Sequence, residues 1–172
     1  RVLFRSWDES LEELRKVQPD YELREVAREK GADARRFELI MRSHGGVRVR
    51  GWLDVPLSEG PHAALLRLPG YTQNMRPLNN TRGLLVLSLN IRGHGTSTDD
   101  VPGQPANFWI RGLDAKETYY YRGAYLDCVR AGDYLASRDD VDPDRIAVWG
   151  VSQGGGLAFA TAALDPSVDL CI

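Results

Sequence analysis

Apolar residues in the middle of the chain form short, nearly continuous runs. Residues 63–68 and 84–89 are two such runs, and each is followed by a loop that contains glycine. Strands buried on both faces of a parallel sheet have this pattern because neither face meets water. Further upstream, residues 37–41 and 47–55 alternate apolar with polar positions across His44-Gly45-Gly46. This alternation predicts an antiparallel hairpin that starts the sheet.

Three segments of the chain have the apolar spacing of a helix. In residues 7–17 the apolar side chains recur every three or four positions, which predicts an accessory N-terminal helix within residues 1–33. Residues 121–136 show the same spacing. Residues 153–164 are rich in Ala and Leu, and an Asp-Pro pair follows them directly, which predicts a helix that ends there.

The remaining segments connect or flank these helices. Residues 145–149 and 168–172 are short and apolar, and they predict two further strands. Residues 98–118 are rich in Asp and Gly and have no period, which predicts a long loop. Strands that alternate with helices are typical of α/β folds. The sequence therefore predicts an α/β fold with a mostly parallel sheet and flanking helices.

Composition narrows the class of protein. The chain has 172 residues, of which 42% are hydrophobic and 27% charged, so we expect one globular domain over residues 1–172. Because the sequence stops inside its last predicted strand, we expect this domain to be partial. The 22 basic and 24 acidic side chains give a net charge of −2, which argues against a protein that coats nucleic acid or binds membranes through a basic patch.

Cysteine usage and hydropathy exclude further classes. Cys128 and Cys171 are too few for a disulfide scaffold and lack the spacing of a zinc site, so we expect no metal. No apolar run approaches the roughly 20 residues that a membrane helix needs, so we expect no membrane partner. The few cysteines and the lack of signal-peptide features favour the cytoplasm.

The most informative motif is Gly150-Val151-Ser152-Gln153-Gly154, which lies between a predicted strand and a predicted helix. In this setting a G-x-S-x-G pattern predicts a nucleophile elbow, a tight turn that holds the serine in a strained conformation. Gly150 and Gly154 leave room for such a turn because they have no side chains. The alternative is that these glycines only permit close packing and that Ser152 caps the helix.

Two backbone N–H groups are candidate donors to an oxyanion. Gln153 follows the serine at the start of the predicted helix, where N–H groups have no partner within the helix. The loop after residues 63–68 reads Pro69-Gly70-Tyr71, and in an elbow of this kind that loop supplies the second donor, here Tyr71. The alternative for Tyr71 is an ordinary turn with a surface tyrosine.

A base and an acid for Ser152 are harder to find. His94 lies in the loop Arg92-Gly93-His94, at the end of a predicted strand, but it precedes Ser152 and so breaks the Ser, acid, His order of α/β-hydrolases. We therefore predict that His94 shapes the loop. His44 and His62 are predicted to be solvent-facing turn residues. The only carboxylates after Ser152 are Asp165 and Asp169, and neither is well placed for the acid.

These motifs resemble the acetyl xylan esterase and cephalosporin C deacetylase family, carbohydrate esterase family 7. The resemblance is carried by the run from Tyr119 to Asp127, by residues 141–146, and by the elbow with its following Gly155-Gly156-Leu157-Ala158. It extends upstream through Pro69-Gly70-Tyr71, residues 46–52 and the helix at residues 7–15. The Arg-Gly-Gln motif of the family is replaced here by Arg92-Gly93-His94, which resembles the Arg-Gly-His-Gly loop of many other α/β-hydrolases.

The resemblance implies a serine esterase on an α/β-hydrolase fold that removes acetyl groups from small carbohydrate esters and needs no cofactor. It implies Ser152 as nucleophile and the N–H groups of Tyr71 and Gln153 as oxyanion hole. Members of the family form hexamers, which implies a homo-oligomer, and place the triad Asp and His beyond the length of this chain. The chain alone is therefore expected to be nearly inactive.

Other readings of the sequence remain open. The chain could be a degenerate hydrolase that only binds an acyl compound or a partner chain. The elbow by itself does not select the acyl group, so a peptidase or a thioesterase is a further alternative. Phe108 and Trp109 are candidates for the sugar pocket, and core packing explains them equally well.

Overall fold

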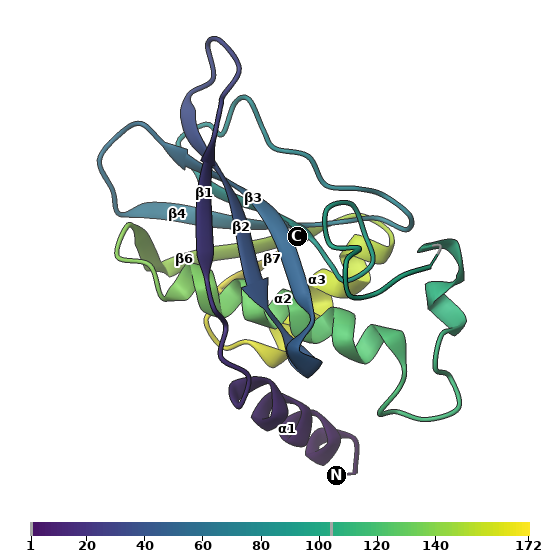
Figure 1. The fold of residues 1–172 in the computed structure, drawn as a ribbon. Coiled ribbons are helices and arrows are strands. Elements are labelled where there is room, and N and C mark those ends of the chain that lie inside the picture. Colours follow the sequence, from purple (N-terminus) through teal and green to yellow (C-terminus); the bar gives the residue numbers. More distant parts are fainter. Residues whose placement is uncertain (1, 104) are drawn as a thin grey trace.

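The protein's computed structural model describes residues 2–103 and 105–172 and contains the expected mixture of strands and helices (Figure 1). The strands are β1 (Glu22–Val26), β2 (Ala34–Arg42), β3 (Arg48–Pro56), β4 (His62–Leu68), β5 (Leu85–Asn90), β6 (Val141–Gly150) and β7 (Leu170–Cys171). The helices are α1 (Val2–Arg15), α2 (Tyr120–Ala136) and α3 (Gln153–Leu164), with short 3-10 turns η1 (His44–Gly46) and η2 (Pro105–Ile110). Every predicted helix is present, and α3 has the predicted bounds.

The strands form one mixed sheet in the order β1-β2-β3-β5-β4-β6-β7. The first half is antiparallel, and it contains the predicted hairpin of β2 and β3. The second half is parallel: β4 pairs in parallel with β5 on one side and with β6 on the other, and β7 pairs in parallel with β6. The carboxyl ends of β4, β5 and β6 therefore meet at one edge of the sheet, which is where open α/β sheets bind ligands.

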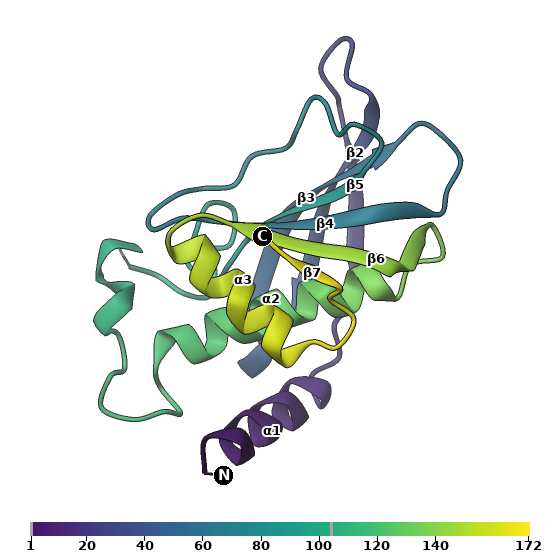
Figure 2. The ribbon, with the colours of Figure 1, turned by 180° about the vertical axis from the view of Figure 1, so that it is seen from behind.

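The helices α2 and α3 cover the same face of the sheet (Figures 1 and 2). The side chains between them and the sheet are almost completely buried, with Leu66, Leu87 and Val148 each 1% exposed or less. From the helices, Ala124 of α2 and Leu157 of α3 fill the same core. This burial fixes α3, and with it the turn that precedes α3, against the ends of β4 and β6.

The N-terminal segment packs on the outer side of α2. Leu14 of α1 is buried against Leu126 and Val129, and the Arg130 side chain donates hydrogen bonds to the carbonyls of Leu14 at 2.6 Å and Val17 at 3.0 Å. Residues 1–33 were predicted to contain only a helix, but they also contain β1. The sheet thus starts one strand before the predicted hairpin, because β1 pairs along its whole length with β2.

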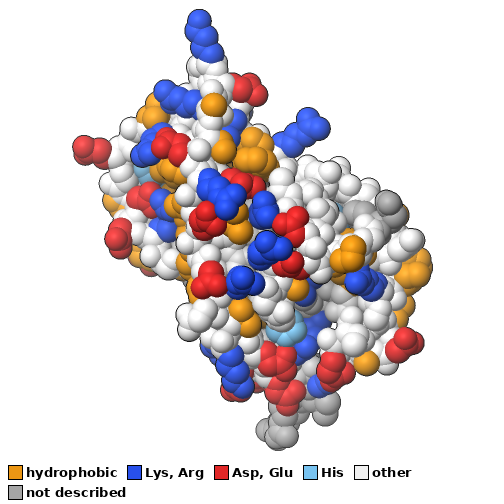
Figure 3. Space-filling view, viewed as in Figure 1, with side chains coloured by type: hydrophobic (Ala, Val, Ile, Leu, Met, Phe, Trp, Pro, Cys, Tyr) orange, Lys and Arg blue, Asp and Glu red, His pale blue; other side chains and the backbone are white. Residues whose placement is uncertain are grey.

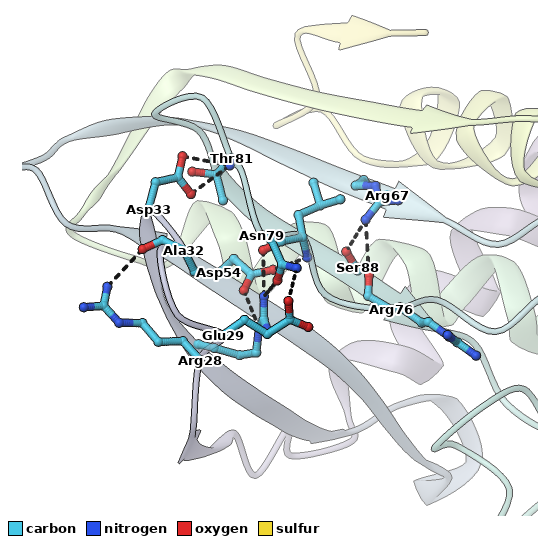
Figure 4. A network of polar contacts seen from close by, with 12 residues as sticks. Arg28, Glu29, Ala32, Asp33, Asp54, Arg67, Arg76, Asn79, Thr81 and Ser88 are labelled. Carbon is cyan, nitrogen blue, oxygen red and sulfur yellow. Dashed lines mark hydrogen bonds and ion pairs between the residues drawn. The ribbon is translucent and has the colours of Figure 1, made fainter.

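The opposite face of the sheet is crossed by the loop of residues 69–84, which joins β4 to β5. Its far end is held by a polar network (Figure 4). Arg36 forms a buried ion pair with Asp54 at 2.8 Å and also donates to the carbonyl of Leu78 at 2.7 Å. Asp33 accepts the N–H of Thr81 at 2.9 Å. These bonds tie residues 78–81 of the loop to β2, to β3 and to the residue before β2.

Charged side chains of both signs are interspersed over β1 and β2 on the outer surface (Figure 3). Many of them are paired, as Arg24 is with Glu22 at 2.7 Å and Arg35 with Glu25 at 3.1 Å. This mixture agrees with the near-zero net charge of the sequence. None of the helices in residues 2–103 and 105–172 combines the length and apolar character that crossing a bilayer requires.

Candidate active site

The turn between β6 and α3 has the strained geometry of a nucleophile elbow. The strand ends at Gly150 and the helix begins at Gln153, so only Val151 and Ser152 form the turn. Ser152 has φ 58° and ψ −120°, a conformation that costs a residue with a side chain about 1–3 kcal/mol and persists only where the surroundings impose it. The side chain of Ser152 is exposed at the end of the strand.

Two glycines make this turn possible. A Cβ atom on Gly150 would lie 2.2 Å from the carbonyl of Gly154, and one on Gly154 would lie 2.7 Å from the carbonyl oxygen of Leu68. The end of β6, the first turn of α3 and the end of β4 are thus packed backbone against backbone. Only glycine fits at either position without moving these segments apart.

The alternative role of Ser152 as a helix cap finds no support in its contacts. Ser152 occupies the N-cap position of α3, but its side chain makes no capping hydrogen bond within the described chain. The backbone of Ser152 is therefore strained while its exposed side chain makes no hydrogen bond that would explain the strain. Such a conformation points to function, because strain of this kind clusters at active sites.

The predicted second loop lies beside this turn. A Cβ on Gly70 would sit 3.5 Å from the carbonyl oxygen of Val151, so the loop after β4 and the turn after β6 are neighbours. The hydroxyl of Tyr71 donates to the carbonyl of Ala106 in η2, and the side chain is 38% exposed. Within residues 2–103 and 105–172, the backbone N–H groups of Tyr71 and Gln153 donate to no protein acceptor.

The side chain of Gln153 joins three elements, a contact that the sequence analysis missed. Its Oε1 atom accepts a hydrogen bond from the hydroxyl of Tyr121 in α2 at 2.5 Å. Its Nε2 atom lies 3.4 Å from the carbonyl oxygens of both Pro69 and Gly70. Burial, reinforced by neighbouring tyrosines, raises the pKa of Tyr121 to about 12, so its hydroxyl keeps its proton at neutral pH.

Arg92 and Gly93 are built into the core at the end of β5. The Arg92 guanidinium donates to both oxygens of Asp127, at 2.9 and 2.8 Å, and the fully buried Asp127 also accepts the Arg92 N–H at 3.0 Å. Gly93 has φ 76°, and a Cβ there would lie 2.3 Å from the Phe108 ring. This loop is therefore anchored to α2 and η2, and the side chain of Arg92 bonds to Asp127 and to the carbonyl of His44 rather than to Ser152.

His94 is 1% exposed and lies among aromatic rings. Its Nδ1 atom is 3.1 Å from the hydroxyl of Tyr120, and that hydroxyl donates to the carbonyl of Arg92 at 2.7 Å. The tyrosine oxygen is then free to accept, which assigns the proton of the imidazole to Nδ1. Burial lowers the pKa of His94, so the ring is neutral. Its Nε2 atom is buried and has no partner among the described residues.

The other histidines lie away from Ser152. His44 pairs with Glu13 of α1 at 2.8 Å. His62 starts β4, at the opposite edge of the sheet from the nucleophile turn. The prediction that His62 faces solvent is wrong, because the residue is only 7% exposed. Its ring lies against Gly60, and its N–H donates to the carbonyl of Asp140.

Later carboxylates and the loop aromatics also have structural partners. Asp165 accepts the hydroxyl of Ser167 at 2.6 Å, and Asp169 accepts the N–H of Ile146 at 2.9 Å. Phe108 is buried and stacks on Tyr120 with ring centroids 4.5 Å apart, as the core-packing alternative predicts for it. Trp109, in contrast, is 55% exposed. Among the described residues, no three His, Cys, Asp or Glu side chains gather in a way that would hold a metal ion.

Comparison with protein families identifies the chain. The model of the acetyl xylan esterase family, AXE1, matches residues 4–171. The chain belongs to this family. Among curated members, the acetyl esterase Axe7A of Xylanibacter ruminicola is 32% identical over 138 residues, which cover 72% of this chain and 31% of that protein.

Solved acetyl xylan esterases have the same fold. Acetyl xylan esterase 1 from Thermoanaerobacterium superposes with a TM-score of 0.88 at 34% identity and covers 98% of this chain. The enzyme from Paenibacillus sp. R4 gives 0.85 at 29% identity and covers 97%. An α/β hydrolase from Penicillium, GrgF, shares the fold at a TM-score of 0.59. The chain spans 56% and 57% of the two solved esterases and less than half of the curated relative.

Proposed function

We propose that this chain carries the nucleophile and the oxyanion hole of a serine carboxylesterase that removes acetyl groups from carbohydrate esters. The observation that carries the proposal is the conformation of Ser152, with φ 58° on an exposed two-residue turn between β6 and α3. Among the described residues the Ser152 side chain makes no hydrogen bond that would account for this strain. A nucleophile that must stand clear of the sheet edge needs this geometry.

The chemistry assigned to the site is acyl transfer through a covalent intermediate. The Ser152 hydroxyl oxygen attacks the acetyl carbonyl carbon while a general base takes the hydroxyl proton. The N–H groups of Tyr71 and Gln153 hold the negative oxygen, and the positive end of the α3 dipole adds to this stabilisation. The ester C–O bond then breaks and the sugar hydroxyl leaves with the proton. Water attacks the acetyl-serine in the same way, releasing acetate and restoring Ser152.

The general base belongs to another part of the active site in this proposal. Among the described residues, His44 pairs with Glu13 and His94 contacts Tyr120, and neither imidazole forms a hydrogen bond with Ser152. His94 is also neutral and buried beside Phe108. Family members are considerably longer than this chain, which is consistent with a base and an acid from other segments. The family relationship supports the acetyl group as the acyl group and a small acetylated sugar as the substrate.

The test uses protein expressed from its complete gene, assayed with acetylated xylo-oligosaccharide and with 4-nitrophenyl acetate. Ser152→Ala is expected to reduce turnover of both to background, because no nucleophile remains. Ser58→Ala, an exposed serine in the turn before β4 at the opposite edge of the sheet, is the matched control and should be unaffected. Full turnover by Ser152→Ala would remove the proposed nucleophile. Hydrolysis of only peptides or thioesters would keep the nucleophile and overturn the acetyl assignment.

A further inference from the structure

The two proposed oxyanion donors come from separate loops, and something must fix the distance between them. The N–H of Gln153 is held by α3, whereas the N–H of Tyr71 lies in the loop of residues 69–84. That loop is tied down at its far end by Arg36 and Asp33, but these bonds hold residues that lie seven or more positions beyond Tyr71 in the chain. Nearer to Tyr71, the Asn90 side chain accepts the N–H of Met75 at 2.8 Å and the Tyr71 hydroxyl donates to the carbonyl of Ala106, but neither bond connects this segment to the turn at Ser152. The backbone bond from the N–H of Gln73 to the carbonyl of Gly70 at 3.1 Å closes a local turn.

The Gln153 side chain spans this gap. Its amide nitrogen faces the carbonyls of Pro69 and Gly70, at 3.4 Å each, and the Gly70 carbonyl belongs to the same peptide group as the Tyr71 N–H. An amide group can rotate and exchange its oxygen and nitrogen ends, and the reversed orientation would set oxygen against two carbonyl oxygens. The hydroxyl of Tyr121 prevents this because it donates to the oxygen end at 2.5 Å and so selects the orientation that presents the nitrogen to the loop.

We propose that Tyr121 is a positioning residue of the active site, which sets the spacing of the two oxyanion donors through the side chain of Gln153. This role rests on the proposed function. It assigns a task to a residue of α2 that touches neither Ser152 nor the acyl group in the proposed chemistry. It also explains why the residue after the nucleophile has a side-chain amide, although its proposed catalytic contribution comes from its backbone.

The helix α2 offers a matched control one turn further along. Tyr125 is also a partly buried tyrosine of α2 and lies 5.9 Å from the Tyr121 ring, centroid to centroid. Among the described residues its hydroxyl makes no hydrogen bond with a protein group. Tyr121→Phe and Tyr125→Phe therefore remove the same atom from the same helix, and only the first removal breaks the link to Gln153.

The kinetic test uses protein expressed from its complete gene. Tyr121→Phe is expected to lower kcat for 4-nitrophenyl acetate about 10-fold to 100-fold with KM nearly unchanged, since a misplaced donor costs mainly transition-state stabilisation. Gln153→Met keeps the backbone N–H and should have an effect at least as large. The double variant should be no worse than Gln153→Met, because the two side chains act in series. Tyr125→Phe should retain the kcat of the wild type.

Thermal unfolding of each variant separates positioning from a general loss of structure. The proposal is supported when Tyr121→Phe loses kcat but unfolds within about 2 °C of Tyr125→Phe. It is overturned if Tyr121→Phe keeps the wild-type kcat, if it loses only stability, or if the effects of the two single variants multiply in the double variant. Ser152→Ala in the same assay distinguishes the two proposals. Activity that survives in Ser152→Ala removes the proposed function, whereas its loss beside an unaffected Tyr121→Phe removes only the positioning role.

Discussion

The close packing of the nucleophile turn makes a sharp prediction for Gly150→Ala. The added Cβ would lie 2.2 Å from the carbonyl carbon and oxygen of Gly154, whereas ordinary contacts of a Cβ begin at 3.4 Å. Both groups are backbone, so no side chain can rotate away. The end of β6 and the first turn of α3 must separate by about 1 Å to admit the methyl group, which is the kind of overpacking that costs about 1–3 kcal/mol.

This displacement acts on activity as well as on stability. Moving α3 carries the N–H of Gln153 away from the loop of Tyr71, and a shift of about 1 Å in a positioned group typically costs about 100-fold in rate. We expect Gly150→Ala to show both effects. Urea unfolding measures the first, and the single-turnover release of 4-nitrophenol from 4-nitrophenyl acetate measures the second, both with protein expressed from its complete gene.

Gly156→Ala is the matched control within the same helix. A Cβ on Gly156 meets nothing within 4 Å, and alanine is the better helix former, so this variant should gain up to about 1 kcal/mol and keep its rate. If Gly150→Ala unfolds and reacts like the wild type, the backbone contact does not hold the turn. If Gly156→Ala loses as much stability and rate as Gly150→Ala, any alanine in the first turns of α3 is harmful and the contact at Gly150 is not the cause.

Three further predictions concern ionisable side chains elsewhere in the fold. Asp127→Ala should lower the free energy of unfolding by about 3–5 kcal/mol in urea at pH 7, because it leaves Arg92 buried without its partner, and a loss below about 1 kcal/mol would contradict this. Hydrogen bonds from Arg48 lower the pKa of Asp100 to about 2, so Asp100→Asn should be less stable than the wild type at pH 7. That difference should vanish as the pH falls from about 4 to about 2 in thermal unfolding, and a constant difference would refute the assignment. Burial lowers the pKa of His94, so the unfolded chain binds its proton first and the wild type should lose stability as the pH falls below about 6.5. His94→Gln should lack this component between pH 8 and pH 5, and equal slopes would show that His94 is not the cause.

The parts of the fold that were predictable have strong local signals. The runs at residues 63–68 and 84–89 are apolar on both faces because α2 and α3 cover one face and the loop of residues 69–84 covers much of the other. The helix α3 was predicted with its observed bounds because the turn at Ser152 precedes its Ala- and Leu-rich sequence and Asp165-Pro166 follows it. The turn at Ser152 was predictable because its strain requires glycines at fixed positions.

The missed elements depend on partners that are distant in the sequence. The strand β1 reads Glu-Leu-Arg-Glu-Val, and four of its five residues are exposed, so it has no apolar alternation. It exists because its backbone pairs with β2 at the edge of the sheet, where charged side chains are acceptable. The bond between Tyr121 and Gln153 joins residues 32 positions apart, and periodicity shows which face of α2 is apolar but not which polar atom its tyrosine meets.

The pairing of β4 with β6 explains why so much of the proposed site follows from this chain. These two strands are parallel neighbours, so the loops that leave their carboxyl ends lie side by side. Ser152 and both proposed oxyanion donors belong to these two loops, and Gln153 links the loops directly. The proposed site for the acyl carbon is therefore built from one strand pair and one side-chain bridge. In the proposed mechanism proton transfer has no such local origin, because the base would approach Ser152 from a further element. Changes at Gly150 or Tyr121 should therefore alter the rate of attack while the pKa values that govern its pH profile stay constant.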